Sequence, residues 1–250
     1  MPEKQLLADY LVLGDSRIKV WHAEGEGRFA EDAYTALGTK RTSLLGDFRV
    51  VGTFPTIQIV LVPNRNEFDR LVRELLSVEI EVPSHPARIA QPQRTDMVVL
   101  SPSAYDADST FAYVPEDFRR LLIHEFIHMI EELLSPDIER TPSWWSEGLA
   151  VYYSEQSRHE DGFRDVALNA IAADALPSFE QILAERKLAY DWGWTIVQYV
   201  ESTFGRDAIL KIVRECSDGD VLGFLGSDSA AFEQAWKGWL RGGGHLGQQV

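Results

Sequence analysis

The segment LLIHEFIHMIEELL, residues 121–134, constrains the fold most, because it combines a long apolar surface with two histidines four positions apart. At 100° per residue its apolar side chains cover a broad arc of an α-helix, and the polar ones share the narrow remaining arc. The residues of this polar stripe are His124, Glu125, His128, Glu131 and Glu132. Pro115 suits a first helical position, so we expect a mostly buried helix over 115–134 whose polar stripe faces a cleft or a partner.

The spacing of the two histidines suits a metal ion. Residues four apart on a helix project from the same face, so the imidazoles of His124 and His128 can reach one point, as tetrahedral zinc requires. Glu125 is displaced round the helix, where it can face a water bound to that ion and act as a general base. These three positions form the pattern H-E-x-x-H. The alternative is an ordinary solvated helix face that carries imidazoles.

A third protein ligand is expected, because a hydrolytic zinc site leaves only its fourth position to water. No further histidine falls on an expected helix, and His159 lies in the loop-like SRHEDG. Glu147 lies in TPSWWSEGLAVYYSEQ, which begins like a helix and is strongly apolar around the acid. A lone carboxylate in that setting needs a compensating positive charge, which zinc would supply. The small Gly148 and Ala150 would let this helix approach its neighbour closely.

The chain resembles the gluzincin metallopeptidases of the thermolysin-like superfamily in one pattern: HEFIH, eighteen further residues and then the glutamate of WWSEGLA. The resemblance is to the branch with the aminopeptidase N and leukotriene A4 hydrolase types, in which H-E-x-x-H-x18-E and W-x-x-E-G-x-A recur. It implies that His124, His128 and Glu147 bind Zn²⁺ and that Glu125 is the base that activates water. The specific motifs cover about residues 115–205, and upstream the likeness rests only on the order of strands and helices.

A second motif concerns the oxyanion. YDWGWTIVQYVESTFG, residues 190–205, is similar to the Y-x-x-G helix start of the same branch, whose tyrosine stabilises the oxyanion. The resemblance implies this catalytic role for Tyr190, since a phenol can donate a hydrogen bond to charge that develops as water attacks. Simple aromatic packing is the alternative for the whole set Tyr190, Trp192, Trp194 and Tyr199. Other candidates for the same role are Tyr113, Tyr152 and Tyr153.

The substrate expectation follows from one departure from that branch. The aminopeptidases carry a G-x-M-E-N segment whose glutamate holds the substrate's free amine, and this chain has DMVVLSPSAY, residues 96–105, where it would stand. In gluzincins this edge strand pairs with an extended peptide or protein substrate. The resemblance thus implies an endopeptidase rather than an aminopeptidase. A zinc hydrolase of non-peptide substrates and a zinc-bearing sensor or interaction domain with little turnover stay open as alternatives.

Periodicity along the chain predicts an α+β fold. Strands are expected at 17–23, 56–62 and 95–102, with helices over 28–45 and after Asn64, which could cap a box-like helix start with Glu67. Beyond Val114 the pattern is almost wholly helical, over 115–134, 143–157, 163–174, 178–187, 190–204, 206–215 and 228–241. We therefore expect a zincin-like, two-lobed catalytic domain: an N-terminal lobe of mixed sheet and helices (1–114), a helical lobe with the zinc site (115–241) and a flexible tail (242–250).

Composition excludes some partners. A net charge of −15 and a pI near 4.8, without a basic patch, argue against nucleic acid. No stretch is expected to span a membrane, and no secretory signal is visible. The chain is thus expected to be cytoplasmic if Met1 is the natural start, and extracytoplasmic if an upstream signal or anchor is missing. The single cysteine, Cys216, is expected to be a small buried hydrophobe. Nothing in the sequence specifies an oligomeric state.

Overall fold

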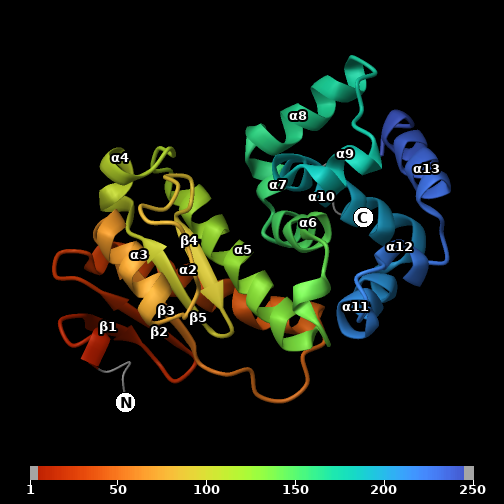
Figure 1. The fold of residues 1–250 in the computed structure, drawn as a ribbon. Helices are drawn as coiled ribbons and strands as arrows, with labels where there is room; N and C mark the ends of the chain where they lie inside the picture. Colours follow the sequence, from red (N-terminus) through yellow and green to blue (C-terminus); the bar gives the residue numbers. More distant parts are fainter. Residues whose placement is uncertain (1–4, 245–250) are drawn as a thin grey trace. The chain divides into compact units, whose positions relative to one another are not determined.

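The computed structural model describes residues 5–244 and has the expected α+β class (Figure 1). Its chain forms two compact units, Met1–Met129 and Ile130–Val250. The division falls inside helix α5, Pro115–Leu134, whereas the sequence pattern placed it near residue 114, before that helix. By this division, residues 115–129 of α5 belong to the first unit and residues 130–134 to the second.

The first unit contains a mixed five-stranded sheet in the order β1-β2-β3-β5-β4. Its strands are β1 Leu11–Gly14, β2 Ile18–His22, β3 Ile57–Val62, β4 Ala90–Gln93 and β5 Asp96–Leu100. The three inner strands run parallel, and β1 and β4 pair antiparallel at the two edges. The strands expected at 17–23, 56–62 and 95–102 are confirmed as β2, β3 and β5. Strands β3 and β5 are almost continuously buried, as is typical of inner parallel strands, whereas β2 alternates.

The prediction that residues 96–105 contain an edge strand of the sheet is wrong. Residues 96–100 form β5, which lies between β3 and β4, and residues 102–108 continue as η1 Pro102–Ala104 and α4 Tyr105–Asp108. The edge is β4, whose sequence AQPQ contains a proline and two amides. Because this segment shows neither apolar alternation nor β-branched residues, its pattern does not predict a strand outside β5.

Two further helices of the first unit are α2 Gly27–Asp47 and α3 Arg65–Glu74. Asn64 caps α3 as expected, accepting a hydrogen bond from the backbone N–H of Glu67. The Glu67 carboxylate does not complete the box; it accepts from the Tyr10 hydroxyl and pairs with Arg70 instead. On α5, Phe126 packs edge-to-face on Phe54, and the expected apolar arc is buried from Leu122 to Ile130, whereas Leu133 is 49% exposed.

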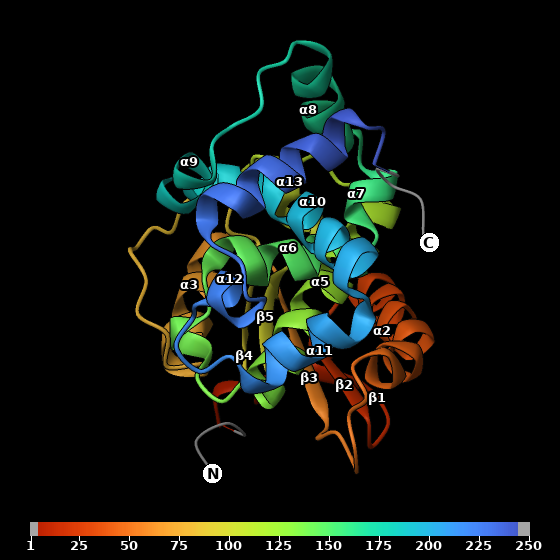
Figure 2. The ribbon, with the colours of Figure 1, turned by 90° about the vertical axis from the view of Figure 1, so that its right-hand side faces the viewer.

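The second unit is helical throughout its described part, residues 130–244. Its elements are η2 Ile138–Arg140, α6 Ser143–Tyr153, α7 Gln156–His159, α8 Asp161–Ala172, α9 Phe179–Ala184, α10 Arg186–Phe204, α11 Arg206–Glu215, α12 Val221–Phe224 and α13 Ser229–Arg241. Helix α10 lies beside α6 and also touches α8, α9, α11 and α13 (Figure 2). Fully buried Trp145, Trp194, Trp236 and Phe232 fill the core around it.

Helix boundaries differ from expectation at two places that matter for the site. The expected helix 143–157 breaks into α6 and α7 at Glu155, whose φ of 66° lies in the left-handed region. Helix α10 begins at Arg186, so Tyr190 lies one turn inside the helix and not at its start.

Cys216 is buried as expected. The expected flexible tail lies, from residue 245 onward, outside the described residues. Between residues 5 and 244, no helix combines the length and the apolar character that crossing a bilayer requires.

Candidate metal centre

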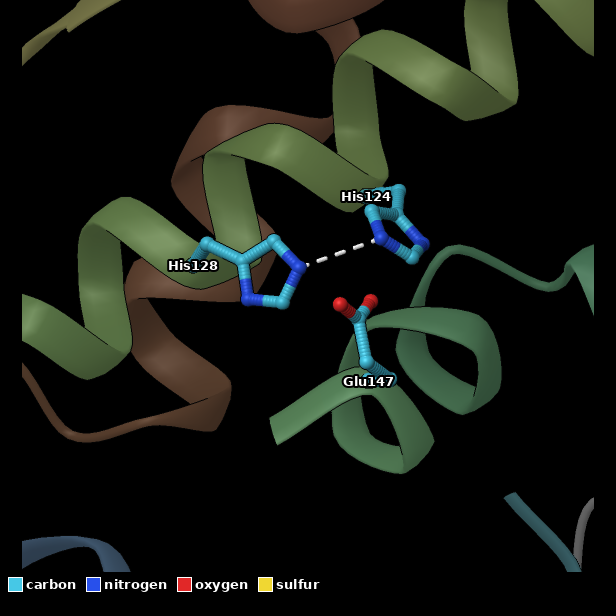
Figure 3. Close-up of side chains that lie close together, drawn as sticks. All are labelled: His124, His128 and Glu147. Carbon is cyan, nitrogen blue, oxygen red and sulfur yellow. Dashed lines mark hydrogen bonds between the residues drawn. The ribbon is translucent and has the colours of Figure 1, made fainter. Parts of the chain in front are cut away.

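His124 and His128 lie on successive turns of α5 with their rings close together. Their Nε2 atoms are 3.1 Å apart, and the ring planes meet at 78° (Figure 3). His124 is only 4% exposed. The helix therefore delivers two imidazole nitrogens to one small region, as the spacing of four residues predicts.

The carboxylate of Glu147 belongs to the same group. One ligand atom from each of His124, His128 and Glu147 lies within 4.8 Å of the other two (Figure 3). Glu147 is in the second turn of α6, on the helix expected to carry it. The structure thus brings together the three residues that the sequence singled out as ligands. His159 is not part of the group: it ends the short helix α7 and is exposed.

A hydrogen bond joins the end of α5 to the start of α6 within the second unit. The Ser146 hydroxyl donates to Glu131 Oε2 at 2.5 Å, and Glu131 is only 1% exposed. Glu131 lies three residues after His128, and Ser146 immediately precedes Glu147. This bond therefore holds the turn of α6 that carries Glu147 against the last turns of α5, the helix that also carries the two histidines. The sequence placed Glu131 in the polar stripe but gave no hint of its partner.

Two glycines let α6 and α10 touch backbone to backbone. A Cβ on Gly148 would lie 2.5 Å from the carbonyl carbon of Gly193, and a Cβ on Gly193 would lie 2.1 Å from the Trp144 carbonyl oxygen. The close approach expected at Gly148 is confirmed. Its partner, Gly193, is the glycine of the Y-x-x-G motif, so this motif also has a packing role beside Glu147.

Glu125 follows His124 on α5 and is buried, at 7% exposure. Tyr190 is half-buried on α10, in the same unit as Glu147. Arg186, which no sequence motif indicated, lies near Glu147 and Tyr190. Its Nη2 is 4.0 Å from Glu147 Oε1, and its guanidinium carbon is 5.9 Å from the centre of the Tyr190 ring. The Tyr190 hydroxyl and, less strongly, the Glu147 carboxylate raise the pKa of Arg186.

The other aromatic candidates are engaged elsewhere. The hydroxyls of Tyr152 and Tyr153 both donate to Glu201, at 2.6 and 3.3 Å, and burial together with that carboxylate raises the pKa of each. Tyr113 packs edge-to-face on Phe29 in the first unit. The packing alternative describes Trp192, Trp194 and Tyr199, which are buried in the helical core. Of the four tyrosines considered, Tyr190 is the one that shares a neighbour, Arg186, with Glu147.

Comparison with known proteins gives no family. No protein-family model matches the chain, and no curated protein matches it either. The function must therefore be inferred from the motif residues and from their geometry.

Proposed function

We propose that this chain is a zinc metallopeptidase of gluzincin type, with a zincin-like, two-lobed catalytic domain. His124, His128 and Glu147 would hold the zinc ion. The observation that supports this most is the convergence of two imidazole nitrogens and one carboxylate, from two helices, within 4.8 Å. Two histidines and a glutamate are also a known ligand set of hydrolytic zinc sites.

The distance between the imidazoles fits this ion. Two ligands at a Zn–N distance of about 2.05 Å in tetrahedral geometry stand about 3.3 Å apart. The observed Nε2–Nε2 distance of 3.1 Å is close to that value. The same distance also allows a hydrogen bond between the rings when one Nε2 carries a proton. Zinc binding at this pair therefore requires both Nε2 atoms to be unprotonated and is expected to release a proton whenever one is bound there.

Zinc, when bound, would polarise the scissile carbonyl and make a water molecule more acidic. The chain's own groups carry the proton. Glu125 accepts a proton from the attacking water and passes it to the leaving amine as the C–N bond breaks. Tyr190 donates a hydrogen bond to the carbonyl oxygen as negative charge develops on it.

The substrate is proposed to bind as an extended peptide. The open edge of the sheet beside β5 is β4, so a peptide that adds a strand on this side would pair with β4. Pro92 lacks an N–H group, which limits the hydrogen bonds this short edge can make. The absence of a G-x-M-E-N segment favours cleavage of internal bonds.

Cleavage of a peptide library, read by mass spectrometry with and without chelator, tests this function. We expect cuts at internal bonds that disappear when zinc is removed and return when it is restored. Cleavage that persists without metal would contradict the zinc mechanism. A protein that binds zinc and cleaves no peptide would instead support a hydrolase of other substrates or a sensor domain, and screens of esters and amides would separate those two.

The Ser146–Glu131 bond gives a second expected result. Ser146→Ala removes the donor to a buried carboxylate, which we expect to destabilise the fold by about 1–3 kcal/mol. Because the bond holds the α6 turn that carries Glu147, zinc affinity should also fall, by roughly tenfold. Competition titration against a zinc indicator and a thermal melt measure the two effects.

Ser143→Ala is the matched control, since Ser143 is exposed on the first turn of the same helix. It should leave zinc affinity unchanged. Equal zinc affinity in the wild-type protein and in Ser146→Ala, despite a lower melting temperature, would show that the bond does not position Glu147.

A further inference from the structure

Arg186 is a cation placed beside the two proposed site residues of the second unit. It lies on the first turn of α10, with Glu147 on one side and Tyr190 on the other. Its neighbour Lys187 pairs with Asp191 on the next turn, as i,i+4 ion pairs on helices commonly do. Arg186 also has a partner four residues on, Tyr190, but in addition its Nη2 approaches Glu147 on α6.

The contact with Glu147 is not the geometry of a closed ion pair. Arginine and carboxylate pair most strongly through two parallel N–H···O bonds at about 2.8 Å. Here a single nitrogen approaches a single oxygen, at 4.0 Å. The side chain of Arg186 is 71% exposed, whereas that of Glu147 is 12% exposed. The planar guanidinium, with its five N–H donors, thus reaches solvent next to the proposed zinc ligand.

The positive charge of Arg186 beside the proposed zinc ligand Glu147 is unusual for a residue with only a structural role. Two neutral imidazoles and one carboxylate leave a divalent cation with net positive charge, and a guanidinium nearby adds to it. A cation next to a metal ligand opposes metal binding unless an anion balances it. The chain is otherwise strongly acidic, with 39 acidic and 24 basic residues. A local positive field in such a chain selects negatively charged ligands.

We propose that Arg186 binds a carboxylate of the substrate, so that the enzyme prefers peptides with an acidic group near the scissile bond. That group is an Asp or Glu side chain or the peptide's own terminal carboxylate, which share the planar shape that a guanidinium recognises. The inference rests on the proposed peptidase function and adds the substrate class. Arg186 recognises substrate in this proposal, while Glu125 and Tyr190 carry the chemistry.

Equilibrium binding to zinc-loaded Glu125→Gln protein tests the inference without relying on turnover. The probes are three pools of decapeptides with randomised uncharged flanks and an uncharged fluorophore, read by anisotropy. One pool has a central Glu and an amidated end, the second has a central Gln and an amidated end, and the third has a central Gln and a free carboxylate. We expect one or both anionic pools to bind about tenfold more tightly than the neutral pool, which corresponds to about 1.4 kcal/mol.

Adding Arg186→Gln should reduce this advantage to less than about twofold, whereas Arg241→Gln should leave it intact. Arg241 is the matched control because it is also exposed in the second unit and its loss changes the net charge equally. Zinc affinity of the Arg186→Gln protein should stay the same or rise.

Three results would overturn the inference. The first is equal binding of all pools, the second is an anionic preference that survives Arg186→Gln, and the third is weaker zinc binding in that variant with a parallel loss for every pool. Failure of the peptidase function looks different, because the wild-type protein would then cleave no library peptide and no pool would bind.

Discussion

Replacing Glu125 by glutamine is expected to abolish peptide cleavage while leaving zinc content at the wild-type level. Glutamine keeps the size of the side chain but cannot accept the proton of the attacking water. General-base catalysis contributes roughly 10²–10⁴-fold, so kcat/KM should fall by about 10³-fold or more. Cleavage kinetics on the best library peptide, together with metal analysis of the same sample, measure both quantities.

Glu116→Gln is the control for this substitution. Glu116 lies in the first turn of α5, is exposed and is outside the H-E-x-x-H motif. Its loss should leave kcat/KM within about twofold, because it makes only a surface ion pair with Arg119. Full activity in Glu125→Gln would exclude Glu125 as the base.

Gly193→Ala is expected to destabilise the second unit strongly. A new Cβ would lie 2.1 Å from the Trp144 carbonyl oxygen, which is backbone and cannot rotate away, so α6 and α10 must separate. We expect a loss of at least about 3 kcal/mol in unfolding free energy. Because the separation also displaces Glu147, zinc affinity should fall with stability. Chemical denaturation and zinc titration of the same preparation test both effects.

Gly238→Ala on α13 is the control, because it adds the same methyl group at a helix position that has open space around it. A Cβ there meets nothing within 4 Å, so the usual preference of helices for alanine should stabilise the protein by up to about 1 kcal/mol. The two alanine substitutions should therefore have opposite signs. Equal stability of both variants would show that α6 and α10 do not touch at Gly193.

The parts of the fold that follow from sequence are those in which local periodicity and burial agree. Helix α5 shows this best, because its apolar arc and its polar stripe both follow from a repeat of 3.6 residues. Strands β2, β3 and β5 are apolar enough to be recognised. The edge strand β4 and the short α12 have no such pattern, and β4 is recognised only by its antiparallel pairing with β5.

The same distinction holds for the site. His124, His128 and Glu147 were found because metal ligation demands particular residue types at particular spacings. The packing role of Gly193 and the Ser146–Glu131 bond cannot be predicted until it is known that α6 packs against α10 and α5. Arg186 had no signal of its own, since a lone arginine in LAERKLAY looks like any exposed residue of a helix. Contacts of this kind are properties of packing, which one sequence does not display.

The zinc content of the purified protein tests the assignment of the ligands most directly. Wild-type protein should hold about one zinc ion per chain after equilibration in a zinc-buffered solution. Elemental mass spectrometry measures this zinc content. Glu147→Ala should hold less than about a tenth of that at the same free zinc, with its fold retained by circular dichroism. A wild-type protein that binds no zinc, or a Glu147→Ala protein that binds it equally tightly, would contradict the proposed centre.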